Sequence, residues 1–193
     1  MPETSNEKHP LLEALLLLGK IFDGDKISYA VTGGLAASYH GSQRATQDID
    51  FLIAVDKIKI SSFLNILRLK GFNFDESETL KSLNQDGLAR VYYKKYPVDF
   101  LMPVIAFFNE VIKRAQSKDF YGAKLRFATP EDLILLKLIA FRPKDQEDIK
   151  SILAAQDPRS IDKQHIFDWL RKLSQPEDGK EAWIKDWMQK LSC

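Results

Sequence analysis

Two acidic residues stand two positions apart at the start of an apolar stretch, Asp48-Ile-Asp50-Phe-Leu-Ile. On a strand, the side chains of Asp48 and Asp50 would emerge on the same face, where their charges repel each other. Burying either carboxylate without a partner is also costly. A divalent cation resolves both problems, because Mg²⁺ binds one or two carboxylates together with substrate phosphates. The pair therefore predicts a site for Mg²⁺ or Mn²⁺.

A third acid, Asp99, lies inside another apolar stretch, Val98-Asp99-Phe100-Leu101. Three acids on adjacent strands, with Mg²⁺, suit in-line transfer of a phosphoryl or nucleotidyl group. The metal neutralises the triphosphate, and one acid can deprotonate the attacking hydroxyl. We expect Asp48, Asp50 and Asp99 to be the catalytic and metal-binding residues.

Gly33 and Gly34 close the strand-like segment Lys26-Ile-Ser-Tyr-Ala-Val-Thr and precede a short helix of small residues. Glycine lets a phosphate approach the backbone without obstruction by a Cβ, and the first amides of the following helix attract the same anion. We therefore expect Gly33 and Gly34 to help hold a triphosphate.

Each of these features also has an ordinary structural explanation. Asp48 could cap local amides in a tight turn ahead of the strand. The two glycines could form only a tight turn between a strand and a helix. Asp99 could form a salt bridge with a nearby cation, and the sequence offers three of them: Arg90, Lys94 and Lys95.

The elements that position these residues follow from the apolar periodicity and from Gly and Pro. The expected strands cover residues 26–34, 49–55, 89–95, 97–102 and 123–127, the third and fourth forming an antiparallel hairpin. The expected helices cover residues 11–22, 35–42, 57–70, 105–115, 130–141, 146–155, 163–173 and 181–191. We expect an α+β fold with a small mixed β-sheet flanked by helices and a helical C-terminal lobe. The sheet domain with its N-terminal helix would cover residues 1–128, and the helical lobe would cover residues 129–193.

The composition excludes several classes of protein. The 193 residues include 28 Lys and Arg against 27 Asp and Glu, so no general charge favours nucleic acid or membrane surfaces. The single cysteine, Cys193, excludes an internal disulfide framework and a zinc site built from cysteines. The opening is polar, and the apolar run 11–18 contains Glu13 and is much shorter than the ~20 residues of a membrane span. We expect a cytoplasmic protein without a membrane partner.

Although the net charge is close to zero, basic and acidic residues are unevenly distributed along the chain. Between Arg90 and Arg126, eight basic residues face three acidic ones. A basic surface suits a polyanion such as a nucleoside triphosphate or RNA, although a solvated face is the more common role of such a stretch.

The ordered set of Gly33-Gly34, Asp48-Ile-Asp50 and Asp99 resembles the signature of the DNA polymerase beta-like nucleotidyltransferase superfamily. That signature is a Gly-Gly or Gly-Ser turn, a short helix, an Asp-x-Asp on a strand and a third acid on a later strand. The resemblance implies the nucleotidyltransferase fold. It also implies an NTP substrate, a Mg²⁺ or Mn²⁺ cofactor, and transfer of a nucleoside monophosphate to an acceptor hydroxyl.

The later segment from Thr129 to Asp148 is similar to the bacterial abortive-infection (AbiEii-type) nucleotidyltransferase toxins and their uncharacterised relatives. That group pairs Arg-x-Thr-x-Asp-x-Asp with a later Thr-Pro-Glu helix that carries a lysine. An Arg, a Lys-Asp pair and a further Asp follow the helix. The similarity implies a possible antitoxin protein as partner.

Carried over to this sequence, the pattern implies that Arg44 and Thr46 support the metal loop and that Lys137 contacts the triphosphate. Asp145 and Asp148 would anchor the helices beside the active site. The residues alone are equally compatible with structural roles. Lys137 could extend its ammonium past its apolar neighbours to solvent, and the two acids could cap the start of a helix.

We therefore predict a metal-dependent nucleotidyltransferase whose acceptor is RNA, a protein or a small molecule, and which could be the toxin of a toxin–antitoxin pair. The rival from another class is a catalytically degenerate nucleotide-binding or regulatory module of the same fold, although the presence of all three acids argues against it. A metal-dependent nuclease also uses clustered acids, but its signature is expected to differ from a Gly-Gly turn with Asp-x-Asp.

Overall fold

The computed structural model describes residues 9–43 and 45–190, and the strands among them form one seven-stranded sheet in the order β3-β4-β5-β2-β1-β7-β6. The strands are β1 (Ser28–Thr32), β2 (Ile49–Ala54), β3 (Phe72–Asn73), β4 (Leu88–Tyr93), β5 (Tyr96–Leu101), β6 (Gln116–Phe120) and β7 (Ala123–Phe127). The α-helices are α1 (Pro10–Gly24), α2 (Gly33–His40), α3 (Ile60–Leu69), α4 (Glu76–Gln85), α5 (Ala106–Arg114), α6 (Pro130–Ala140), α7 (Pro143–Ala155), α8 (Lys163–Leu173) and α9 (Lys180–Lys190). Two 3₁₀ turns, η1 (Lys57–Lys59) and η2 (Pro176–Asp178), complete the order.

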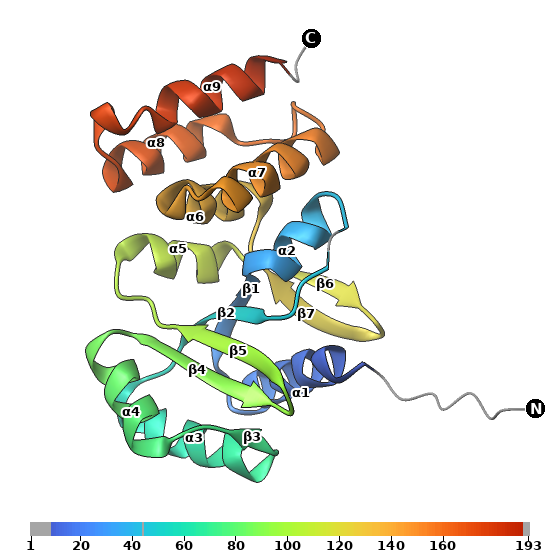
Figure 1. Cartoon of the computed structure of the whole chain (residues 1–193), viewed down its shortest axis with the longest axis vertical. Coiled ribbons are helices and arrows are strands. Elements are labelled where there is room, and N and C mark those ends of the chain that lie inside the picture. Colours follow the sequence, from blue (N-terminus) through green and yellow to red (C-terminus); the bar gives the residue numbers. More distant parts are fainter. Residues whose placement is uncertain (1–8, 44, 191–193) are drawn as a thin grey trace, which may run out of the picture.

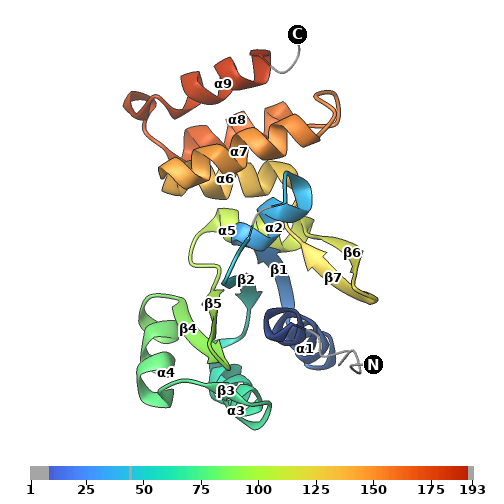
Figure 2. The same cartoon turned by 45° about the vertical axis from the view of Figure 1, so that its right-hand side comes forward.

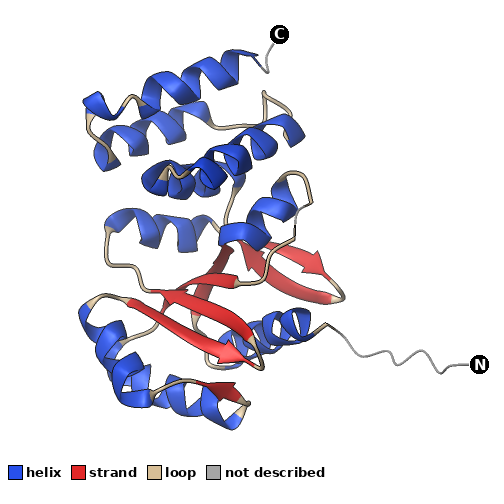
Figure 3. Cartoon of the chain, in the orientation of Figure 1, coloured by secondary structure: helices blue, strands red, loops and turns tan. Residues whose placement is uncertain are grey.

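The helices lie on both sides of the sheet. Helices α1 and α3 lie on one side, α2 and α5 lie on the other, and α6 to α9 stack beyond α2 and α5 (Figures 1 and 2). Figure 3 shows the strands as a band between these two groups of helices. The sheet is mixed, because β2 pairs parallel to β5 and antiparallel to β1. The α+β fold with a mixed sheet and a C-terminal group of helices is therefore confirmed.

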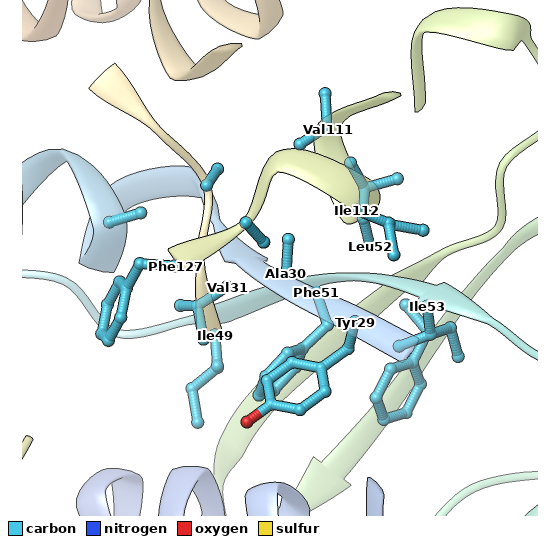
Figure 4. Packing of buried hydrophobic residues seen from close by; sticks show 14 of the residues in the cluster. Tyr29, Ala30, Val31, Ile49, Phe51, Leu52, Ile53, Val111, Ile112 and Phe127 are labelled. Atoms are coloured by element: carbon cyan, nitrogen blue, oxygen red, sulfur yellow. The ribbon is translucent and has the colours of Figure 1, made fainter. Parts of the chain in front are cut away.

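Strand β2 is apolar on both faces because helices cover both. Phe51 points toward the side of α1, where its ring meets Phe22 edge-on at 5.1 Å between centroids (Figure 4). Leu52 points the other way, toward Ile112 of α5 (Figure 4). Since side chains alternate along a strand, Asp50 shares the face of Leu52, on the side of α2 and α5.

Strand β4 has a different pattern. Its residues alternate between exposed and buried, and the exposed set consists of Leu88, Arg90 and Tyr92. This is the pattern of a strand with one face on the core and the other face in water. The sheet is therefore solvated on one face at β4.

A buried acid, Asp132, connects the helices after β7 to helix α5, which packs on the sheet. Asp132, in the first turn of α6, has no exposed surface. Its carboxylate accepts a hydrogen bond from Arg114 Nε on α5 at 3.1 Å and bonds His165 Nε2 on α8 at 2.6 Å. The side chain of Thr129 caps α6 by accepting from the backbone N–H of Asp132. Charged contacts thus connect α5, α6 and α8.

Three elements were not expected from the sequence. Helix α4 exposes most of its residues and buries only Thr79 and Leu83, so its apolar periodicity is weak. Strand β6 is an edge strand without a fully buried residue, and β3 has two residues. Helix α7 also begins at Pro143, earlier than the expected residue 146. Within the described residues, no helix combines the length and apolar character that a membrane crossing requires.

Candidate active site

Four residues on neighbouring strands lie in one row across the sheet. Arg90 on β4 is paired with Asp99 on β5, Asp99 with Asp50 on β2, and Asp50 with Thr32 on β1. Side chains of directly paired residues share a face of the sheet, so all four project on the side of α2. The expectation that Asp50 and Asp99 stand next to each other on adjacent strands is confirmed.

The carboxylate of Asp50 lies against the N-terminus of α2. Gly33 has a φ of +62°, and a Cβ at this position would overlap Asp50 Oδ2. The backbone N–H of Gly34 donates a hydrogen bond to the Asp50 carboxylate, and the partial positive charge at the helix start favours that negative charge. The two glycines are therefore the first turn of a helix, not the end of a strand, and they contact an acid of the site. Their role toward a triphosphate stays a prediction.

Asp50 is a largely buried carboxyl with two other acids, Asp48 and Asp99, close to it. Burial raises the pKa of this carboxyl to about 6, and the charges of Asp48 and Asp99 act in the same direction. The Gly34 N–H and the positive charge of Lys137 oppose the rise without cancelling it. A cation bound beside Asp50 would remove this repulsion.

Asp99 is held by an arginine. Arg90 Nε donates to Asp99 Oδ1 and Arg90 Nη2 donates to Asp99 Oδ2, both at 2.6 Å. The side chain of Asp99 is 20% exposed and that of Arg90 is 54% exposed. The structural alternative for Asp99, a salt bridge to Arg90, is confirmed. Lys94 instead bonds Glu13 of α1 at 2.8 Å.

Asp48 lies in the loop ahead of β2, which begins at Ile49, so the expectation that Asp48 belongs to the strand is wrong. Thr46 Oγ1 donates a hydrogen bond to Asp48 Oδ1 at 2.7 Å and so holds the carboxylate in this loop. Arg44 lies outside the described residues. A cavity of about 310 Å³ adjoins the loop, and its lining consists of His9, Thr46, Gln47, Lys95, Tyr96 and Pro97.

Lys137 of α6 is buried in an ion-pair network with α7. Its Nζ lies 2.6 Å from Asp148 Oδ2 and 3.7 Å from Asp145 Oδ1. The alternative in which this lysine extends to solvent is therefore wrong. Asp145 also accepts hydrogen bonds from the backbone N–H and Nε of Arg142, so its role as a helix cap is confirmed. Contact of Lys137 with a triphosphate stays a prediction.

The acids do not form a finished metal cluster. In the described ranges 9–43 and 45–190, no three His, Cys, Asp or Glu side chains are grouped closely enough to hold one ion. Asp99 is bonded to Arg90, and Asp48 is bonded to Thr46. The donor chemistry nevertheless fits Mg²⁺ or Mn²⁺, because the acids supply hard oxygen ligands. The repulsion between Asp50 and its acidic neighbours is also only partly offset by the Gly34 N–H and Lys137.

From the sequence, Arg90 is only one of three candidate salt-bridge partners of Asp99, and Thr32 is not indicated as a member of the row. A usable signal was present for Arg90: the tight turn at Lys94 and Lys95 pairs Tyr93 with Tyr96 and fixes the register of the hairpin. That register places Arg90 opposite Asp99. No comparable local signal indicates Thr32, whose place depends on the pairing of β1 with β2.

The sequence matches a family model described as "Nucleotidyl transferase of unknown function (DUF2204)" over residues 12–179. No relative was found among curated proteins. Three solved structures share the fold. An antigenic nucleotidyltransferase-like protein from Paracoccidioides brasiliensis is 19% identical, with 90% of this chain and 91% of that chain covered and a TM-score of 0.50.

The second is the lincosamide antibiotic adenylyltransferase LnuA, which is 15% identical, with 75% of this chain and 97% of that chain covered and a TM-score of 0.54. The third is the antibiotic-resistance factor ANT(2'')-Ia, which is 14% identical, with 84% of this chain and 91% of that chain covered and a TM-score of 0.57. Identities this low support the shared fold, not a shared substrate.

Proposed function

Because the chain belongs to the family of nucleotidyl transferases whose model spans residues 12–179, we propose that it moves a nucleoside monophosphate from an NTP to an acceptor hydroxyl. The observation that carries the proposal is the position of Asp50, which lies next to Asp99 and against the N-terminus of α2. This arrangement puts the Asp50 carboxylate at a helix N-terminus, a place that also suits a phosphate, with the Asp99 carboxylate on the neighbouring strand.

In this proposal, Asp48 and Asp50 hold Mg²⁺ or Mn²⁺, and Asp99 completes the site or acts as the base. The cation supplies charge neutralisation for the triphosphate when it is bound. Thr46 fixes the direction of the Asp48 carboxylate through its 2.7 Å hydrogen bond. The role that the resemblance implies for Arg44 falls on a residue outside the described ranges. Asp50 and Asp99 come from the paired strands β2 and β5, and Asp48 comes from the loop ahead of β2.

The first turn of α2, at Gly33 and Gly34, holds Asp50 through the Gly34 N–H and would attract the phosphates with the partial positive charge of the helix start, and Lys137 would add positive charge from α6. The acceptor oxygen attacks the α-phosphorus and its proton passes to Asp99. The bond between the α-phosphorus and the bridging oxygen breaks, and pyrophosphate leaves with the electron pair. The first 128 residues would supply the acids, and residues 129–193 would form the lobe that covers them.

The test is incubation of the protein with each labelled NTP, Mg²⁺ and total cell extract, followed by analysis of which macromolecule or small molecule carries label. We expect label with one or more NTPs, and none after chelation of the metal or with Asp50→Asn. The matched control is Asp56→Asn, which changes an exposed acid just beyond the other end of β2. Absence of label and of NTP binding in the unmodified protein would contradict the proposal.

One observation favours a second candidate, a nucleotide-binding or regulatory module without catalysis. Both oxygens of Asp99 are engaged by Arg90, so the third acid is not poised for an ion or a proton. Binding of Mg²⁺-ATP or Mg²⁺-CTP in a calorimetric titration, without any labelled product, would favour this candidate.

Because the segment from Thr129 to Asp148 is similar to abortive-infection toxins, we also propose that the transfer activity is toxic and that an antitoxin protein inhibits it. Expression of the chain should then arrest growth, and Asp50→Asn should restore it. Growth arrest by both forms would separate toxicity from nucleotide transfer.

A further inference from the structure

Arg90 stands at the solvated end of the row of paired residues that crosses the sheet. Its side chain is 54% exposed and lies between Leu88 and Tyr92 on the solvated face of β4. One side of the guanidinium faces Asp99, and much of the remainder is accessible to a ligand. The row across the sheet therefore ends in a cation that is one strand away from Asp99 and two strands away from Asp50.

The bond between Arg90 and Asp99 competes with any cation at the same carboxylate. Both oxygens of Asp99 accept from the guanidinium at 2.6 Å, in the paired geometry that makes such bonds strong. A divalent cation between Asp50 and Asp99 would be repelled by Arg90 and would draw on the same oxygens. Asp99 becomes fully available to a cation only when the guanidinium has another anion to bind.

We propose that Arg90 exchanges partners during the reaction, holding Asp99 until the phosphates of the nucleotide bind the guanidinium and release Asp99 to the cation and the acceptor. The inference rests on the proposed function and adds to it a residue that couples nucleotide binding to completion of the metal site. A triphosphate is the fitting second partner, because a planar guanidinium binds phosphate through the same paired geometry that it uses with a carboxylate.

A purely structural role makes different predictions. Oppositely charged residues directly paired across two antiparallel strands stabilise a sheet by about 0.2 to 1 kcal/mol. If that were the whole role of Arg90, its loss would lower the melting temperature slightly and leave the affinities for metal and nucleotide unchanged.

The experiment measures binding of Mn²⁺ alone, and of an uncleavable α,β-methylene ATP analogue in saturating Mn²⁺, by calorimetry. The variants are Arg90→Gln, which removes the charge, and Arg90→Lys, which keeps the charge but loses the paired geometry. The matched control is Arg68→Gln, since Arg68 forms an exposed 2.6 Å salt bridge with Glu76 on α3 and α4. Melting curves for each variant establish that the fold is retained.

We expect Arg90→Gln to bind Mn²⁺ alone about 3- to 10-fold more tightly and the ATP analogue about 10-fold more weakly, with Arg90→Lys between the two forms. In an Asp99→Asn background, Arg90→Gln should no longer tighten Mn²⁺ binding, because there is no paired carboxylate to release. Unchanged or weaker Mn²⁺ binding by Arg90→Gln, or an equal effect of Arg68→Gln, would overturn the inference.

The two proposals fail in different ways. If the unmodified protein transfers label while Arg90→Gln changes neither affinity, the partner exchange is wrong and the nucleotidyltransferase function stands. If no NTP yields labelled product although Arg90→Gln tightens Mn²⁺ binding and weakens analogue binding, the transfer function is wrong and the exchange at Arg90 stands.

Discussion

The carboxylate of Asp50 occupies the space that a side chain on Gly33 would need. Gly33 is the first residue of α2, Asp50 lies on β2, and a Cβ built on Gly33, whose φ is +62°, would overlap Asp50 Oδ2. A glycine at this position therefore serves two purposes: it permits the left-handed backbone conformation, and it leaves room for an acid at the start of α2.

Gly33→Ala should lower the free energy of unfolding by about 3 kcal/mol, because it adds backbone strain and displaces Asp50. The control is Gly122→Ala in the turn between β6 and β7, where φ is +79° and no atom lies within 4 Å of the new Cβ. That variant should lose only about 1 kcal/mol. Denaturant titration measures both. Equal losses would show that Asp50 does not constrain Gly33.

Asp50→Asn should abolish transfer and stabilise the fold near neutral pH. Because burial and two acidic neighbours raise the pKa of Asp50 from 3.8 to about 6, the folded state favours the protonated carboxyl. The stability from this preference is complete below pH 3.8 and is lost as the pH rises through about 6. We expect Asp50→Asn to raise the free energy of unfolding by about 1 to 2 kcal/mol above pH 6.5 and to change it little at pH 3.5. The value is reduced for the residual contact of Asp50 with solvent.

Melting curves across this pH range test the expectation. Asp56→Asn, the exposed control beyond the far end of β2, should shift the melting temperature little at any pH. A loss of stability by Asp50→Asn at pH 7 would show that its negative charge supports the fold and would contradict the repulsion described above.

Lys137→Met should lower the free energy of unfolding by about 3 to 5 kcal/mol, because it leaves the buried acids Asp145 and Asp148 without their shared cation. Lys185→Met, which breaks a 2.6 Å pair with Glu181 on an exposed face, should cost less than about 1 kcal/mol. Urea titration gives both values. Similar values for the two lysines would show that burial of the network is unimportant.

A double variant separates the structural role of Lys137 from its predicted role toward the triphosphate. Lys137→Met with Asp148→Leu removes both charges of the closest pair, and we expect part of the lost stability to return. If the affinity for an uncleavable ATP analogue remains low in this restabilised variant, Lys137 contributes to nucleotide binding. An affinity equal to that of the unmodified protein would leave the lysine with a structural role alone.

Asp132→Asn should lower the free energy of unfolding by about 2 to 4 kcal/mol, because it weakens the contacts to Arg114 and His165 in a fully buried place. Glu181→Gln, an acid in the first turn of α9, is the matched control and should have a small effect. The Mn²⁺ affinity of the folded Asp132→Asn protein should be unchanged. A changed affinity would place Asp132 within the site.

The placement of Asp50 and Asp99 on neighbouring strands could be predicted from the sequence because strong local signals coincide there. Asp50 and Asp99 each stand between apolar residues that are buried on β2 and β5, and such an interruption is visible without any tertiary information. The start of helix α6 is also predictable from the sequence, because Thr129 suits the N-cap and Pro130 the first helical position.

The sequence offered Arg90 as one of three candidate partners of Asp99 but could not choose among them, and it did not indicate the other contacts. The Arg90–Asp99 bond, the ion pair of Lys137 with Asp148 and the place of Asp50 at the start of α2 each join separate elements. Side-chain pairing of this kind depends on strand register and helix packing, which local periodicity does not determine. Helix α4 was missed for a different reason, since a helix that is mostly polar gives a weak periodic signal.

The contacts of Asp132 have a consequence for how α5, α6 and α8 can move. Helices α5, α6 and α8 meet at one carboxylate that is fully removed from water, so moving any of them relative to the others means breaking charged bonds where they are strongest. These three helices are therefore tied into one unit at Asp132, and any movement of the C-terminal helices as a group must carry α5 with it or break these bonds.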